Sequence, residues 1–179
     1  MRIIAGSHKG ARIFAPRGRD TRPTGDRVRE AVFNLVGSVE GMEVLDLFAG
    51  SGAMGLEALS RGAAHATFVE ADRLAAETIV RNLDKLRFRT ATVLREDVAR
   101  KLAADAAAGR RYDLVLIDPP YRMLADVLPT FAAHLPALVE GEGLVVVESD
   151  SRVEPGLPLP LRTSRRYGSV RVTVFTGLQ

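Results

Sequence analysis

The chain has 179 residues, which is enough for one domain with a substantial hydrophobic core. It contains no cysteine, so disulfide bonds, thiolate metal ligands and cysteine nucleophiles are excluded. Hydrophobic residues make up 46% and charged residues 26% of the chain, an ordinary balance for a soluble globular protein, and no apolar run approaches the ~20 residues that span a bilayer.

The N-terminal segment is basic and punctuated by glycines. Although the formal net charge is only +3, residues 1–30 contain the basic side chains Arg2, Lys9, Arg12, Arg17, Arg19, Arg22, Arg27 and Arg29. This concentration favours a polyanionic partner such as RNA or DNA; the alternative is a solvated arm without a specific role. The segment lacks the apolar stretch of a secretory signal, so we expect a cytoplasmic protein.

Residues 3–4 and 12–14 are apolar and predict a small hairpin at the start of the chain. Residues 22–36 predict a helix that is opened by Thr24 or Asp26 and that turns Val28, Val32, Leu35 and Val36 inward. We therefore expect a basic N-terminal extension over residues 1–40, followed by the main domain over residues 41–179.

From residue 43 onward, apolar runs and helical patterns alternate. The runs predict strands at 43–48, 65–69, 90–94, 112–117 and 143–148. The patterns between them predict helices at 52–61, 72–86, 98–108 and 123–135, the third stopped at Gly109 and the last at Pro136. In the second helix, Ile79, Val80, Leu83 and Leu86 recur at three- and four-residue spacing. Such alternation is typical of an α/β fold with a parallel sheet covered on both faces.

The end of the chain has a different pattern. Two runs at 161–167 and 170–175 are separated by Gly168-Ser169, a pair suited to a type II′ turn, so the last two strands should form an antiparallel hairpin. A hairpin that closes an otherwise parallel sheet argues against the all-parallel dinucleotide-binding fold.

The stretch "DLFAGSGAMG" at residues 46–55 places Gly50, Gly52 and Gly55 directly after a strand. This G-x-G-x-x-G spacing is typical of a turn that binds a nucleotide cofactor at a helix N-terminus. The turn alone leaves two cofactors open, a nicotinamide or flavin dinucleotide and a single adenosine compound.

Two acidic residues follow the next strands. Glu70, twenty residues after Gly50, could accept both ribose hydroxyls, as both cofactors would require. Asp97 could accept a hydrogen bond from the adenine amino group, which fits one adenosine lying across three strand ends; it could equally be the N-cap of the helix that follows.

The stretch Asp118-Pro119-Pro120-Tyr121 follows the strand at 112–117 and should lie at the carboxyl edge of the sheet, beside the cofactor. The prolines fix the turn, so the Asp118 carboxylate and the Pro119 carbonyl can accept hydrogen bonds from one planar amine, while Tyr121 offers a face for base stacking. The alternative is a chance Pro-Pro turn with an exposed tyrosine.

These groups suit methyl transfer to an exocyclic amine. The amine nitrogen must become tetrahedral as it attacks a sulfonium methyl group, and acceptors for its hydrogens favour that state. A dehydrogenase would need an acid or base beside the nicotinamide, and His8, His65 and His134 lie at no suitable strand end. Neither a metal ion nor a covalent intermediate is required.

The stretches "RIIAG", "RPTGDRVREAVFN", "DLFAGSGAMGLEALSRGA", "VEADR", "DPPY" and "VESD" resemble, in order and spacing from Arg2 to about Asp150, the bacterial 16S ribosomal RNA guanine-N2 methyltransferases of the RsmD family. The resemblance implies a Rossmann-like, seven-stranded S-adenosylmethionine-dependent methyltransferase fold. It also implies a guanine of 16S ribosomal RNA in the small ribosomal subunit as substrate, and we expect a monomer that acts without a metal or a membrane.

The resemblance also assigns roles to residues of this chain. Asp118, Pro119 and Tyr121 would be catalytic. Cofactor contacts would come from Thr24, Asp46, Phe48, Ala49, Gly50, Ser51, Gly52, Glu70, Ala71, Asp97, Val98 and Asp118. RNA contacts would come from Arg12, Arg17, Arg19, Arg22 and Tyr121. For Thr24, binding of the methionine carboxylate at the helix N-terminus and an ordinary cap remain two alternatives.

Three functions therefore remain open. The first is the ribosomal RNA guanine-N2 methyltransferase. The second is an amino methyltransferase that acts on DNA adenine or on a protein glutamine side chain. The third is a non-catalytic RNA-binding assembly factor that keeps the cofactor fold.

Overall fold

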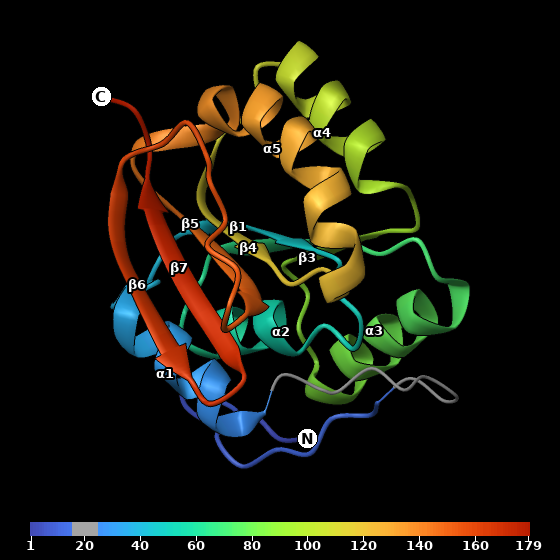
Figure 1. The fold of residues 1–179 in the computed structure, drawn as a ribbon. Helices are drawn as coiled ribbons and strands as arrows, with labels where there is room; N and C mark the ends of the chain where they lie inside the picture. The colour runs from blue at the N-terminus through green and yellow to red at the C-terminus, as the bar shows by residue number, and fades with distance from the viewer. Residues whose placement is uncertain (16–24) are drawn as a thin grey trace.

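The computed structural model describes residues 1–15 and 25–179, which form one mixed sheet with helices on both faces (Figure 1). The seven strands lie in the order β3-β2-β1-β4-β5-β7-β6. Their bounds are β1 Glu43–Leu47, β2 His65–Val69, β3 Ala91–Leu94, β4 Tyr112–Ile117, β5 Val139–Asp150, β6 Leu161–Tyr167 and β7 Val170–Thr176. β1 to β5 pair in parallel, whereas β7 pairs antiparallel with both β5 and β6, so the α/β fold with a C-terminal hairpin is confirmed.

The hairpin turn has the predicted backbone. Gly168 has a φ of +65°, and Tyr167 pairs with Val170 across the turn. Ser169 has no positive φ, which is the combination that distinguishes a type II′ from a type I′ turn. A glycine is needed at the first central position because L side chains rarely adopt that conformation.

The helices form two layers. Their bounds are α1 Asp26–Val36, α2 Ala53–Ser60, α3 Arg73–Leu86, α4 Val98–Ala107 and α5 Leu124–Leu138. In Figure 1, α1, α2 and α3 lie below the sheet, and α4 and α5 lie above it. Side chains alternate accordingly along β1. Val44 packs in the core between the sheet and α1 to α3, whereas Leu45 and Leu47 pack in the core between the sheet and α4 and α5. No helix of the described residues is long and apolar enough to cross a membrane.

Four local predictions are wrong. The last helix does not stop at Pro136 but continues to Leu138, because Leu135 and Leu138 are both fully buried and packing outweighs the hydrogen bond that a proline cannot donate. The strand predicted at 143–148 is longer at both ends. Val80 is 45% exposed, since only Ile79 and its turn-spaced neighbours reach the core. Asp26 is the first residue of α1 and not its cap; Gly25 is the N-cap.

The first fifteen residues pack against the main sheet. Arg2 and Arg12 form an antiparallel bridge, flanked by the hydrogen bond from the Ile3 amide to the Ala11 carbonyl, so the expected hairpin is present in minimal form. The side chains of Ile3 and Ile13 are buried in the same core as α1 and α2. The division of the chain near residue 40 into two units stays a prediction.

Candidate active site

The glycine turn joins β1 to α2 at the carboxyl edge of the sheet. Gly50 and Gly52 have φ values of +57° and +79°, and Gly52 is the N-cap of α2, so both positions favour glycine. A Cβ atom on Gly55 would lie 2.3 Å from the Phe68 ring of β2, so this glycine lets the helix approach the sheet. Backbone conformation or close packing thus explains why each position of the motif is a glycine.

Asp46 lies beneath this turn and is 2% exposed. Its Oδ2 atom accepts a 2.9 Å hydrogen bond from the Gly55 amide, which fixes α2 to the end of β1. Burial raises the pKa of Asp46 well above its usual value; the Gly55 hydrogen bond opposes this, and the negative charges of Asp118 and Glu70 add to it. Carboxyl groups that follow the two strands next to β1 thus lie close enough to Asp46 for their charges to act on it.

The raised pKa of Asp46 makes a prediction about stability. A carboxyl group whose pKa is higher in the folded than in the unfolded state stabilises the fold fully below the unfolded value of ~3.9, and this contribution is lost as the pH rises through the folded pKa. Asp46→Asn keeps an oxygen for the Gly55 amide and removes the titration. We expect the ligand-free variant to have a higher Tm than the wild type at pH 7, with the difference shrinking toward pH 4. An unchanged or widening difference in thermal unfolding would contradict this.

Glu70 follows β2 and supports the turn from the other side. Its carboxylate accepts 2.8 Å hydrogen bonds from the Gly50 amide and from the Asp72 amide, and the residue is 6% exposed. Contact of Glu70 and of its neighbour Ala71 with a ribose stays a prediction.

Asp97 follows β3 and caps α4. Its Oδ1 atom accepts hydrogen bonds from the Ala99 and Arg100 amides at 2.9 and 3.2 Å, so the N-cap alternative is confirmed. Asp97 is exposed at the same edge as Glu70, and its contact with adenine stays a prediction.

The Asp-Pro-Pro-Tyr turn follows β4, the direct neighbour of β1 in the sheet. Because Ile117 is in register with Leu47, Asp118 leaves the sheet beside Phe48 and the glycine turn. Pro119 is buried, and the Pro120 carbonyl accepts a 2.7 Å hydrogen bond from the Met123 amide, which closes a 3₁₀ turn over Tyr121–Met123. This turn leaves Tyr121 41% exposed, as an aromatic ring that binds a base requires.

The predicted RNA-binding residues fall mostly outside the part of the chain that the structure describes. The structure does not describe three of them, Arg17, Arg19 and Arg22, nor the predicted cofactor residue Thr24. Arg12 is described and is exposed. Within residues 1–15 and 25–179, no group of three or more His, Asp or Glu side chains could hold a metal ion.

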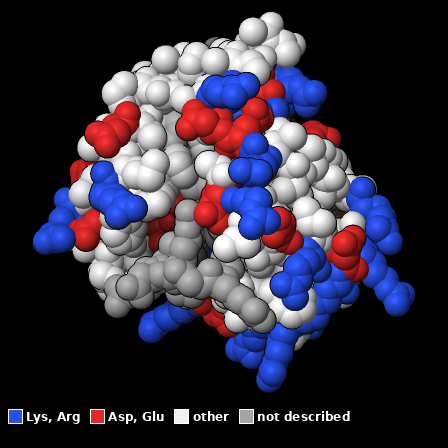
Figure 2. Space-filling model, turned by 90° about the vertical axis from the view of Figure 1, so that its right-hand side faces the viewer, with Lys and Arg blue, Asp and Glu red and all other residues white. Residues whose placement is uncertain are grey.

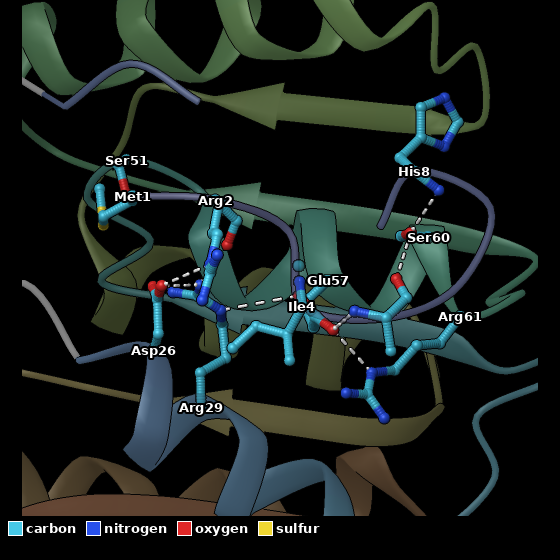
Figure 3. Close-up of polar contacts among 12 residues, drawn as sticks. Met1, Arg2, Ile4, His8, Asp26, Arg29, Ser51, Glu57, Ser60 and Arg61 are labelled. Carbon is cyan, nitrogen blue, oxygen red and sulfur yellow. Dashed lines mark hydrogen bonds and ion pairs between the residues drawn. The ribbon is translucent and has the colours of Figure 1, made fainter. Parts of the chain in front are cut away.

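Sequence reasoning missed a buried polar cluster that ties the N-terminal residues to α2 (Figure 3). Glu57 is fully buried and accepts hydrogen bonds from the Ile4 amide at 2.8 Å, the Ala5 amide at 3.0 Å and Arg61 Nε at 2.8 Å. Arg29 of α1 is also fully buried, with its Nε atom 3.7 Å from the Glu57 carboxylate. The sequence pattern does not predict that these charged residues are buried, because their burial depends on packing between distant segments.

Asn82 of α3 forms a second link and was also missed. Its side chain is fully buried, accepts a 2.7 Å hydrogen bond from the Phe14 amide and donates 3.0 Å hydrogen bonds to the Phe14 and Ser51 carbonyls. Ser51 belongs to the glycine turn, so this one amide group connects that turn to the N-terminal residues.

Comparison with known proteins identifies the family. The model of the family described as "Conserved hypothetical protein 95" matches residues 1–176. The chain belongs to this family. The relatives within it include Ribosomal RNA small subunit methyltransferase D of Escherichia coli K12, which is 39% identical over 161 residues, or 88% of this chain and 78% of that protein. The resemblance drawn from the sequence motifs is thereby confirmed.

Solved structures agree with the fold. Hypothetical protein TTHA0928 of Thermus thermophilus has a TM-score of 0.86 and 32% identity, covering 98% of this chain and 99% of that one. TrmN of Thermus thermophilus has a TM-score of 0.71 and 26% identity, covering 84% of this chain and 48% of that one. The structure of SMU.776 complexed with SAH has a TM-score of 0.70 at 15% identity and shows only that the fold is shared.

Proposed function

We propose that the protein methylates the N2 amine of a specific guanine in 16S ribosomal RNA of the small subunit, with S-adenosylmethionine as methyl donor. The observation that carries the proposal is that Asp118 follows β4 directly beside the end of β1, where Asp46 accepts a hydrogen bond from the Gly55 amide and the glycine turn begins. The small-subunit methyltransferases in the family support the choice of substrate.

The site fits the cofactor by shape and charge. The positive-φ glycines form a turn that exposes backbone beside a helix N-terminus. Glu70 and Asp118 follow their strands beside the glycine turn, and carboxyl groups there favour a ligand that carries a sulfonium and an ammonium group. When bound, S-adenosylmethionine supplies an electrophilic methyl group. Asp46 holds the turn, Glu70 would bind the ribose and Asp97 the adenine.

Asp118 and its neighbours would handle the amine. The Asp118 carboxylate and the Pro119 carbonyl would each accept a hydrogen bond from the amine. These bonds would orient the lone pair of the amine and stabilise the positive charge that develops on its nitrogen. Asp118 would then hold the released proton. Tyr121 would stack on the guanine, which must be unpaired or flipped out of its helix to reach this edge.

A methyl transfer assay tests the proposal. Small subunits from a strain that lacks the protein are incubated with it and with methyl-labelled S-adenosylmethionine, and the rRNA is digested to nucleosides. We expect label in 2-methylguanosine at one position. If the label is found instead on DNA adenine, or on protein that remains after nuclease treatment, the second alternative would be favoured. If none of these molecules carries label, the assembly factor would be favoured.

A further inference from the structure

We propose that the Phe14 ring with the Arg81 and Lys85 side chains, here called the α3 surface, binds the sugar-phosphate backbone of the substrate RNA. The inference rests on the proposed function for the identity of the RNA. It adds a binding surface on the main domain to the arginines predicted in the N-terminal extension.

The α3 surface is built around one exposed aromatic ring. Arg81 Cζ lies 4.5 Å from the centroid of the Phe14 ring and Lys85 Nζ lies 4.6 Å from it, while Phe14 is 39% exposed. The two cationic groups are therefore no more than about 9 Å apart, which is within the Debye length of about 10 Å at 0.1 M salt. A phosphate beside them would relieve their mutual repulsion.

Neither cation is neutralised by a carboxylate among the residues that the structure describes. Arg73, about two turns before Arg81 on α3, shows the contrast, because its Nη1 atom lies 2.6 Å from the Glu77 carboxylate. The Phe14 ring instead holds Arg81 and Lys85 by cation–π contacts, which restrict their side chains before any ligand binds. Less conformational entropy is then lost when they bind a phosphate.

The α3 surface also has a fixed position relative to the active site. The buried Asn82 amide hydrogen-bonds to the Phe14 backbone on one side and to the Ser51 carbonyl of the glycine turn on the other. Phe14 therefore lies beside the cofactor turn and directly precedes the arginine-rich residues of the extension. Figure 2 shows Lys and Arg side chains gathered over the lower part of the face that carries α3. An RNA strand whose base enters the site would meet these cations.

The test compares charge removal at two places. R81Q/K85Q removes two positive charges from the α3 surface, and R162Q/R165Q removes two exposed ones from β6 at the opposite edge of the sheet. Binding to deproteinised 16S rRNA and to whole small subunits is measured from 50 to 200 mM salt. R81Q/K85Q should weaken both about tenfold and reduce the slope of log affinity against log salt by about 1.4 to 1.8. R162Q/R165Q should change neither, and all variants should keep the wild-type Tm.

A third variant separates the ring from the charges. F14L keeps the backbone bonds to Asn82 and both cations but removes the cation–π contacts, so affinity should fall about threefold at an unchanged salt slope. Equal losses in R81Q/K85Q and R162Q/R165Q, or an unchanged slope in R81Q/K85Q, would overturn the proposal. A loss confined to whole subunits would assign the α3 surface to a ribosomal protein and would overturn it as well.

The proposed function is judged separately. If the unaltered protein transfers no methyl group but its RNA binding depends on Arg81 and Lys85, the proposed reaction fails and the RNA-binding surface stands. If the unaltered protein transfers methyl groups and R81Q/K85Q binds RNA as the wild type does, the proposed reaction stands and the RNA-binding surface fails.

Discussion

Asp118→Ala should lower the rate of methyl transfer to small subunits about 10²- to 10³-fold, while S-adenosylmethionine still binds. The variant loses the acceptor that favours the tetrahedral amine, and preorganised groups of this kind have effects of that size when removed singly. Cofactor binding should change only a few-fold, because the glycine turn, Asp46 and Glu70 are retained. Single-turnover transfer and calorimetric titration with S-adenosylmethionine measure the two quantities.

Two further variants sharpen this result. Asp118→Asn keeps one acceptor oxygen without the negative charge, so its rate should lie between those of the wild type and the alanine variant. Asp126→Ala removes an exposed carboxylate from the first turn of α5 and should leave transfer nearly unchanged. Wild-type turnover by Asp118→Ala, or a loss of cofactor binding equal to the loss of rate, would remove Asp118 from the proposed chemistry.

Glu57→Ala should lower the free energy of unfolding by about 3 kcal/mol, at the lower end of the ~3–5 kcal/mol typical of a broken buried ion pair. The substitution leaves the fully buried Arg29 guanidinium without Glu57, and the Ile4 and Ala5 amides without their acceptor. Arg29 Nη2 would still contact Asp26 at 2.9 Å, which limits the loss. For a chain of this length, Tm should fall by on the order of 10 °C.

The matched control is Glu77→Ala on α3. Glu77 also pairs with an arginine, but both side chains are more than half exposed, so its removal should cost less than about 1 kcal/mol. Urea unfolding of both variants measures the difference. Glu57→Gln keeps the size of the side chain and an acceptor oxygen for only one of the two amides, so its stability should fall between those of Glu57→Ala and the wild type. Similar losses in Glu57→Ala and Glu77→Ala would contradict the importance of the buried cluster.

Most of the fold could be predicted from the sequence because its strands are short apolar runs bounded by glycines and acidic residues. The same logic located the site: Asp46, Glu70 and Asp118 each lie at or just after the end of a parallel strand, and such ends meet at one edge of a sheet. Asp97 shows the limit, since a helix cap and a ligand contact place the same residue type at the same position.

The parts that could not be predicted depend on contacts between distant segments. Proline is expected to end a helix, but the buried Leu135 and Leu138 extend α5 through Pro136. Glu57 and Asn82 occupy helix positions where polar residues are ordinarily exposed, and only the docking of the first fifteen residues makes them buried partners.

The contacts of Glu57 and Asn82 also constrain how the chain folds during its synthesis. The Ile4 amide is 53 residues from its acceptor and the Phe14 amide is 68 residues from its own. At a translation rate of ~5–20 residues per second, the second acceptor is made about 3 to 14 seconds after Phe14. Until then the beginning of the nascent chain has apolar side chains without a core, and a chaperone that binds exposed apolar segments would find its target there.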